Sequence, residues 1–240
     1  MNDPKILLTV AARGGSKGVE NKNIRNLNGI PLIAHTLKQA QAWGRADKII
    51  CSTDSPQIAK IAREYGVEVP FMRPAELATD TAGKLDVLRH AVGAVEELSG
   101  KRFDVIVDLD ATAPIRKVDD IERAYQLFEK NRPNCLFSVV PARKNPYFNM
   151  VEVNKKGYAS LCKLPNVPIL RRQDAPKVYD LNASIYVYDR KFLINKNTKT
   201  VISDKSIIYE MDEWGAVDID TEADFQIIEY LLSQKIIHLQ

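Results

Sequence analysis

The sequence predicts an α/β fold in which helices cover both faces of a mostly parallel sheet, forming a three-layer sandwich. Residues 5–12 and 103–109 are apolar almost throughout, as expected for strands that are buried on both faces. Segments with the apolar spacing of helices separate such runs. The chain has 240 residues, of which 45% are hydrophobic and 27% are charged. It is therefore long enough for one such domain with an elaboration.

Strands and helices alternate along the first half of the chain. Pro31 suits the first turn of a helix, Ser55-Pro56 suits the start of another, and Gly66 suits its end. The expected elements are strands at 5–12, 48–53, 67–71 and 103–109, with helices at 32–40, 56–66 and 85–98. This alternation is typical of parallel strands joined by crossover helices.

The second half contains one segment that breaks this pattern. A helix at 118–131 and a strand at 136–140 are followed by residues 141–180, which contain five prolines and many arginines and lysines. A stretch this long is unusual as a loop in a compact domain, so we expect it to pack on another chain. A strand at 183–188, a helix-like stretch after Asp189, a strand at 215–219 and a helix at 221–234 complete the chain. Residues 1–140 and 181–240 are thus predicted to form the main domain, with 141–180 inserted as an extension.

Bulk properties exclude several classes of protein. The net charge is +3, and there is neither a basic stripe nor a nucleic-acid-reading module, so no nucleic-acid partner is expected. No apolar stretch is long enough to cross a bilayer, so no membrane partner is expected. Cys51, Cys135 and Cys162 are far apart and lack C-x-x-C spacing, which fits a reducing cytoplasm.

A glycine-rich loop follows the first strand. Gly14, Gly15 and Gly18 allow sharp turns and close approach of backbone N–H groups to a ligand. Arg13 and Lys17 add positive charge, so the loop suits a polyanion such as a nucleoside triphosphate. The alternative is a flexible turn with solvated cations. The spacing matches neither a Walker A loop nor a dinucleotide-binding fingerprint.

Residues 12–18, followed by Lys22-Asn23, resemble the signature of the CMP-sugar-acid synthetases, cytidylyltransferases that act on sialic acid and related nonulosonic acids. Six further motifs fall in the order found in that family: residues 52–54, 73–77, 80–81, 114–116, 182–183 and 218–221. The resemblance implies a Rossmann-like fold of the nucleotide-diphospho-sugar transferase type, with CTP and a nonulosonic acid as substrates. It also implies a homodimer, in which residues 141–180 cross to the partner and complete its sugar site.

The nucleotide site is expected around the glycine loop. Arg13 and Lys17 suit the triphosphate by charge, and the resemblance assigns them the same role. Lys22 and Asn23 match family positions near the triphosphate and the cytosine or ribose. The predicted nucleotide-binding set is Ala12, Arg13, Gly14, Gly15, Ser16, Lys17, Lys22, Asn23, Arg73 and Asp80. For Arg73, an ordinary surface role is equally compatible with the spacing, and Arg116 suits either a helix entry or a sugar contact.

Asp218 and Asp220 are the candidate ligands of Mg²⁺. Residues i and i+2 of a strand point to the same side, so both carboxylates can face one hard cation while Ile219 faces the core. The resemblance places the metal pair here too. The alternative for Asp220 is a cap for the helix that follows it. Arg13, Lys17 and Asp218 are the predicted catalytic residues.

Five residues are candidates for sugar binding. Asp110 stands where the sialic acid synthetases usually carry a glutamine, so we expect it to contact an amine or hydroxyl of the sugar or to help hold Mg²⁺. The resemblance assigns sugar contacts to Arg171, Arg172 and Gln173, partly from the facing subunit, and to Asn182. Departures from the sialic acid pattern at residues 84–86, 108–114 and 171–176 resemble the legionaminic acid branch.

The predicted reaction joins CTP to a nonulosonic acid, with N,N'-diacetyllegionaminic acid favoured, and releases pyrophosphate. The anomeric hydroxyl attacks the α-phosphorus in line while cations stabilise the leaving group. No general base is evident, so metal-assisted deprotonation is favoured over a nearby carboxylate. The alternatives are the same reaction on N-acetylneuraminic acid or Kdo, a nucleotidyltransferase for a sugar phosphate, and a non-catalytic nucleotide-binding protein.

Overall fold

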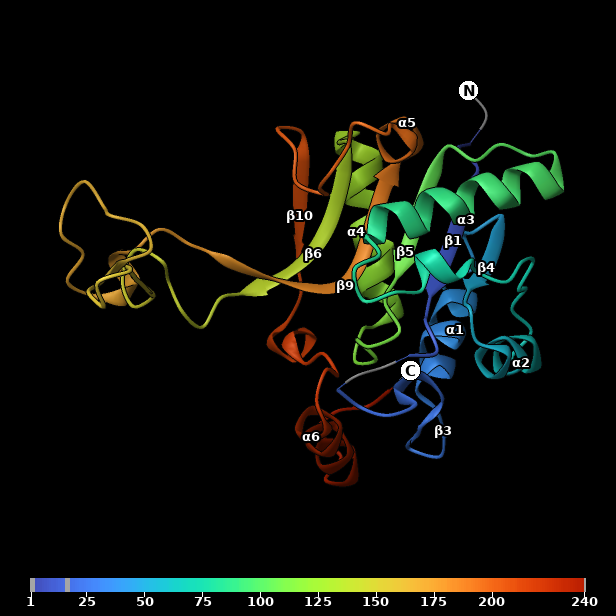
Figure 1. The fold of residues 1–240 in the computed structure, drawn as a ribbon, viewed down its shortest axis with the longest axis horizontal. Helices are drawn as coiled ribbons and strands as arrows, with labels where there is room; N and C mark the ends of the chain where they lie inside the picture. Colours follow the sequence, from blue (N-terminus) through green and yellow to red (C-terminus); the bar gives the residue numbers. More distant parts are fainter. Residues whose placement is uncertain (1–2, 16–17, 240) are drawn as a thin grey trace.

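The computed structural model describes residues 3–15 and 18–239. A six-stranded sheet forms the centre of the molecule, in the order β10-β6-β9-β5-β1-β4 (Figure 1). Its strands are β1 (Ile6–Ala11), β4 (Lys48–Ser52), β5 (Val105–Leu109), β6 (Cys135–Pro141), β9 (Tyr179–Asp189) and β10 (Ser206–Glu210). Strand β9 runs antiparallel to both of its neighbours, whereas the other neighbouring pairs are parallel. The predicted mostly parallel sheet is therefore confirmed.

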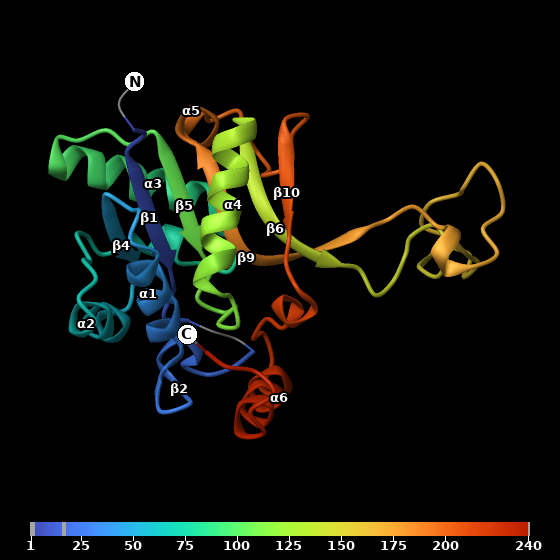
Figure 2. The same ribbon diagram turned by 180° about the vertical axis from the view of Figure 1, so that it is seen from behind.

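Helices cover both faces of this sheet, as Figures 1 and 2 show from opposite sides. On one face lie α1 (Leu32–Trp43), α2 (Pro56–Glu64) and α4 (Val118–Asn131), which share an apolar core with the sheet. On the other lie α3 (Lys84–Ser99) and α5 (Arg190–Ile194), with a second core. Leu7 packs in one core and Leu8 in the other, because successive side chains of a strand point to opposite faces.

The last helix, α6 (Glu222–Ser233), lies beyond the carboxyl ends of the strands (Figure 2). It contributes Phe225 and Ile228 to a third apolar core, which also contains Val19 and Ile219. A small hairpin of β2 (Asn26–Leu27) and β3 (Ile30–Pro31) packs nearby, after the short helix η1 (Lys22–Ile24). This third core brings the segment after the glycine loop against the end of the chain.

The strand predicted at residues 215–219 is wrong. Residues Glu213–Ala216 form a single turn of 3₁₀-helix, η4, in which the Asp212 side chain caps the N-terminus by accepting from Gly215 N. The sheet takes its edge strand from β10 instead, which is only partly buried and so lacks a continuous apolar signal. The strand predicted at residues 67–71 is reduced to one isolated parallel bridge with β4, between Glu68 and Ile50.

Between β6 and β9 the chain leaves the body of the molecule as a long arm (Figures 1 and 2). The arm contains β7 (Val151–Val153), paired with β8 (Ala159–Leu161), and the short helix η3 (Arg172–Asp174). Its apolar side chains are unusually exposed: Leu164 is 79% exposed and Leu170 is 84% exposed. Among the described residues, no helix is both long and apolar enough to cross a membrane.

Candidate active site

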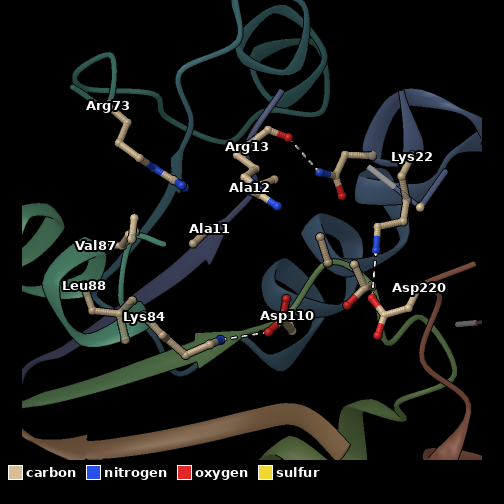
Figure 3. Close-up of a pocket in the computed structure, with 15 residues that line it drawn as sticks. Ala11, Ala12, Arg13, Lys22, Arg73, Lys84, Val87, Leu88, Asp110 and Asp220 are labelled. Carbon is tan, nitrogen blue, oxygen red and sulfur yellow. Dashed lines mark hydrogen bonds and ion pairs between the residues drawn. The ribbon is translucent and has the colours of Figure 1, made fainter. Parts of the chain in front are cut away.

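A cavity of about 350 Å³ opens at the carboxyl ends of β1 and β5 (Figure 3). It lies where the glycine loop leaves the sheet, as expected for an open α/β sheet. The lining residues come from six parts of the chain: Ala11–Arg13, Gly18–Asn23, Arg73, Ala82–Leu88, Asp110–Thr112 and Asp220. Of the predicted nucleotide-binding residues, Ala12, Arg13, Lys22, Asn23 and Arg73 line the cavity.

Polar contacts hold the described part of the glycine loop in place. Gly14 N donates to Asp54 Oδ1 over 2.9 Å, and Asn23 Nδ2 donates to Arg13 O over 3.0 Å. The Arg13 guanidinium forms an ion pair with Asp80, at 2.6 Å between Nη1 and Oδ1. Asp80 therefore orients a cation of the loop. The predicted residues Ser16 and Lys17 lie outside the described residues.

Arg73 lies in the wall of the cavity and is not an ordinary surface residue. It is only 7% exposed, and its guanidinium donates to Ser52 Oγ over 3.2 Å and to the carbonyl oxygen of the same residue. Burial lowers the pKa of Arg73, although the charge of Asp54 acts in the opposite direction. Ser52 ends β4, so Arg73 supplies fixed positive charge beside the glycine loop.

The segment 218–220 lies against the glycine loop although it is some 200 residues away in the sequence. Lys22 Nζ donates to Ile219 O and lies 3.2 Å from Asp220 Oδ1 (Figure 3). Gly18 packs so closely that a Cβ placed there would lie 1.9 Å from Asp220 O. Ile219 is fully buried and its N–H donates to Thr112 O over 3.0 Å. Backbone contacts thus place Asp220 in the wall of the cavity.

Asp218 does not line this cavity, as the predicted metal pair required, but a second one of about 820 Å³, and there it has the character of an incomplete cation site. Its Oδ1 is buried without a hydrogen-bond partner among the described residues. Burial raises the pKa of Asp218; a hydrogen bond from Thr112 opposes this rise, and the charges of Asp110 and Asp220 add to it. Carboxylate oxygens are hard ligands, and a buried one without a partner favours binding of a cation such as Mg²⁺. Mg²⁺ would take its other ligands from water and phosphate. In the described part of the chain, no three His, Cys, Asp or Glu residues form a metal-binding group.

Comparison with known proteins decides the family. The model of a family described as Cytidylyltransferase matches residues 7–235. The chain belongs to the cytidylyltransferase family. The sequence-based predictions of family, fold and enzyme class are therefore confirmed.

Two relatives of this cytidylyltransferase match it over nearly their whole length. It is 45% identical over 231 residues to the "CMP-N,N'-diacetyllegionaminic acid synthase" of Campylobacter jejuni, covering 96% of each chain. It is equally similar to the "Post-translational flagellin modification protein B" of Campylobacter coli, with the same coverage. A solved CMP:2-keto-3-deoxy-manno-octonic acid synthetase complexed with CTP has a TM-score of 0.69 at 17% identity, over 96% of this chain and 99% of that one. This likeness shows the shared fold.

One residue of the cytidylyltransferase cleft was missed as a site residue in the sequence. Lys84 lines the cavity, and its Nζ lies 2.8 Å from Asp108 Oδ2 and 2.8 Å from Asp110 Oδ2. In the sequence, the i, i+2 pair of aspartates at the end of β5 was visible, but the cation that joins them lies 24 residues earlier. A lysine at a helix start has no distinctive spacing that would have revealed it.

Two polar residues from the sequence motifs, Arg116 and Asn182, are buried in the fold. Arg116 is 1% exposed and donates to Ser184 O, Gln39 Oε1 and the carbonyl of Asp110. These hydrogen bonds stabilise the main chain at Asp110 and Ser184, and Arg116 does not line the cavity. Asn182 is also buried: its Oδ1 accepts from Ser138 Oγ over 2.6 Å and its Nδ2 donates to Gly215 O over 2.9 Å. A sugar contact by Asn182 stays a prediction, because it would require these bonds to rearrange.

The three predicted sugar contacts of the arm do not join the cavity within one chain. Arg171 forms an ion pair with Asp174, at 2.8 Å from Nε, and Arg172 donates to Ala142 O over 3.2 Å. Gln173 follows Arg172 in η3, and all three side chains are exposed. The arm carries them away from the sheet (Figure 1). Any contact with substrate would therefore have to be made in another subunit.

Proposed function

We propose that the enzyme joins CTP to a nonulosonic acid, giving the CMP-sugar and pyrophosphate, with N,N'-diacetyllegionaminic acid as the favoured substrate. The observation that carries this proposal is the cleft in which Lys22, Arg13 and Arg73 face Asp220. Cations and a carboxylate that line one cleft suit a triphosphate bound together with a divalent ion. The 45% identity to a protein named as the legionaminic acid synthase supports the choice of sugar.

The residues of the cleft have distinct roles in this reaction. The anomeric hydroxyl of the sugar acid attacks the α-phosphorus, the bond to the β-phosphate oxygen breaks, and pyrophosphate leaves. Arg13 and Arg73 provide positive charge for the leaving group, and Lys22 links the loop to the segment 218–220. Mg²⁺, if bound by Asp218 and Asp220, would neutralise phosphate charge and favour ionisation of the attacking hydroxyl. Lys17 is proposed to assist Arg13.

Pyrophosphate release from CTP, with Mg²⁺ and a panel of sugar acids, tests this function. We expect turnover to be fastest with N,N'-diacetyllegionaminic acid. Faster turnover with N-acetylneuraminic acid or Kdo would change the substrate but keep the chemistry. CTP binding without pyrophosphate release from any acid would instead indicate a non-catalytic nucleotide-binding protein.

We further propose that the protein is a homodimer in which each arm covers the partner's cleft. Residues 142–178 contain eight lysines and arginines but only two acidic residues. Near the base of the arm, a second cavity of about 820 Å³ contains acidic Asp180, Glu210 and Glu213 beside apolar Trp214 and Ile227. A basic arm with exposed apolar side chains complements this surface in both charge and polarity.

Cytoplasmic location is part of the same proposal. All three cysteines are free, and burial raises the pKa of the Cys51 thiol to about 12. Such a thiol stays protonated and unreactive. We expect the native protein to fractionate together with cytoplasmic markers.

A further inference from the structure

Lys84 occupies an unusual position at the start of α3. From the first turn of that helix, its side chain reaches the carboxyl end of β5 and bonds to Asp108 and Asp110 there. Figure 3 shows the bond to Asp110. Its ammonium also lies 4.5 Å from the centre of the Tyr186 ring. The three N–H groups of the ammonium therefore have two carboxylates and an aromatic face as neighbours, which fixes the side chain on several sides.

The two aspartates have different surroundings. Asp108 is 1% exposed, and its second oxygen, Oδ1, accepts from Thr9 Oγ1 over 2.7 Å. It is a buried counter-ion of Lys84 and does not line the cavity. Asp110 does line the cavity, and its Oδ2 is the oxygen bonded to Lys84. Within the described part of the chain, Lys84 is the one hydrogen-bond donor to the Asp110 carboxylate, so Oδ1 is available to a ligand.

The main chain at Asp110 is held independently. Its N–H donates to Ser184 O over 3.2 Å, and its carbonyl oxygen accepts from the buried Arg116 over 3.4 Å. Because the backbone is fixed from both sides, only the side-chain torsions of Asp110 remain to be set. Lys84 is the group in contact that can set them.

We propose that Lys84 is a positioning residue: anchored by Asp108, it holds Asp110 in the cleft so that Asp110 Oδ1 accepts a hydrogen bond from a hydroxyl or N–H group of a bound substrate. The inference rests on the proposed function and assigns a role within it. The ammonium also offsets the charge of the two carboxylates, which would otherwise repel a triphosphate in the same cleft. A carboxylate kept charged but partly neutralised can accept a substrate hydrogen bond without excluding the nucleotide.

The test must separate this role from simple neutralisation of the buried Asp108. Lys84→Met alone would leave Asp108 buried without its partner and could unfold the protein. The double variant Lys84→Met/Asp108→Asn removes both charges together and should keep a melting temperature close to that of the wild type. We expect its kcat/KM for pyrophosphate release to fall about 10- to 100-fold, the loss typical of a misplaced charged hydrogen bond.

Two further variants serve as matched controls. Asp108→Asn alone weakens the anchor of Lys84 but keeps its contact with Asp110, so its kcat/KM should fall less than that of the double variant. The kcat/KM of Asp110→Asn should fall as much as that of the double variant. The kcat/KM of the triple variant, with all three substitutions, should fall no further than that of Asp110→Asn, because the effects of residues that act through one group are not additive.

The kinetic constants identify the donor. A rise in the KM of the sugar acid alone places the hydrogen-bond donor on the sugar, and a rise in the KM of CTP alone places it on the nucleotide. Activity of the double variant within threefold of the wild type would overturn the proposal, as would full additivity in the triple variant. A crystal structure of the double variant gives a readout that does not depend on activity. If the Asp110 carboxylate stays in its wild-type position there, the proposal is wrong even when no sugar acid of the panel is turned over.

Discussion

At the scale of single residues, the cleft combines fixed cations with carboxylates, and two of the cations are paired with them: Lys22 with Asp220 and Lys84 with Asp110. Arg73 and Lys22 are held by main-chain oxygens, so their charges are placed before a ligand binds. Such fixed groups need little reorganisation when charge develops on a leaving group. The same scale explains why Arg116 and Asn182, polar and part of sequence motifs, are absent from the wall of the cavity. Their partners are internal, and spacing in a sequence carries no information about where a side chain finds its partner.

Replacement of Lys22 tests the cation that links the glycine loop to Asp220. Lys22→Met removes bonds to Ile219 O and Asp220, so kcat/KM should fall about 10- to 100-fold, as expected for lost charge-assisted hydrogen bonds. Steady-state pyrophosphate release measures the change. Lys130→Met, on the exposed side of α4, is the matched control and should leave both activity and melting temperature unchanged. An equal loss in both variants would contradict a specific role for Lys22.

The ion pair between Glu96 and Arg190 predicts a pH dependence of stability. Burial alone would raise the pKa of Glu96, but hydrogen bonds from Arg190 and from Phe103 N outweigh it, and the net pKa is lowered. A lowered pKa means that the pair stabilises the fold above the ordinary carboxyl pKa and that this contribution is lost as the pH falls below it. Urea unfolding should show Glu96→Gln to be less stable by about 1 kcal/mol at pH 7 and closer to the wild type at pH 3.5.

Glu64→Gln serves as the control for that experiment. Glu64 forms a looser pair with Lys60, at 3.8 Å, and both side chains are more than half exposed. Its substitution should change the free energy of unfolding very little at either pH. If Glu96→Gln and Glu64→Gln gave the same pH profile, the partly buried pair would not be the source of the effect.

At the scale of elements, the site depends on contacts between segments that are remote in the sequence. Helix α6 and its core hold residues 218–220 against the chain after the glycine loop. The sequence predicted β1, β4, β5, β6, β9 and most of the helices, because their apolar runs or helical spacing are strong. It failed at residues 215–219, where a cap by Asp212 turns the chain into a 3₁₀-helix, and at β10, a partly exposed edge strand. Asp218 and Asp220 therefore do not lie on a strand as expected; main-chain contacts with Thr112 and Gly18 hold their segment instead.

Gly18 provides a direct test of this contact between segments. Gly18→Ala would place a Cβ 1.9 Å from Asp220 O, so one of the two backbones must move. We expect kcat/KM to fall at least about tenfold, because small shifts of catalytic groups reduce rates strongly. Gly93→Ala is the matched control, since a Cβ there has no neighbour within 4 Å. In the middle of α3 it should raise stability by about 0.5 to 1 kcal/mol and leave activity unchanged.

At the scale of the whole molecule, the arm is the feature that a single chain does not explain. It extends from β6 and β9 without packing on its own domain (Figure 2), and it exposes apolar side chains such as Tyr158. A surface of this kind is unfavourable in water unless something covers it. The proposed homodimer would cover it and bring Arg171, Arg172 and Gln173 into a partner's cleft. It would also explain why three predicted sugar contacts lie far from the cavity of their own chain.

Reversing charge near the acidic cavity tests the dimer. Asp180→Lys/Glu213→Lys should weaken self-association of the protein, because the arm that would dock there is basic. Light scattering over a range of protein concentrations should show dimers for the wild type and a larger share of monomers for the variant. Glu64→Lys/Glu97→Lys makes the same change of charge elsewhere on the surface and should remain dimeric. A wild-type protein that is monomeric and fully active would contradict the proposal.

The sequence by itself determined the fold class and the glycine loop, because apolar periodicity and clustered glycines are local patterns, and the reaction class followed from the resemblance of its motifs to a known family. Tertiary structure alone decided which polar residues meet. Lys84 joins Asp108 and Asp110, Lys22 reaches Asp220, and Arg116 turns inward, since each partner is chosen by packing between elements that lie far apart in the sequence. The sequence gives the number and order of the charged residues, but the partner of each charged side chain is determined only when the sheet and its covering helices pack together.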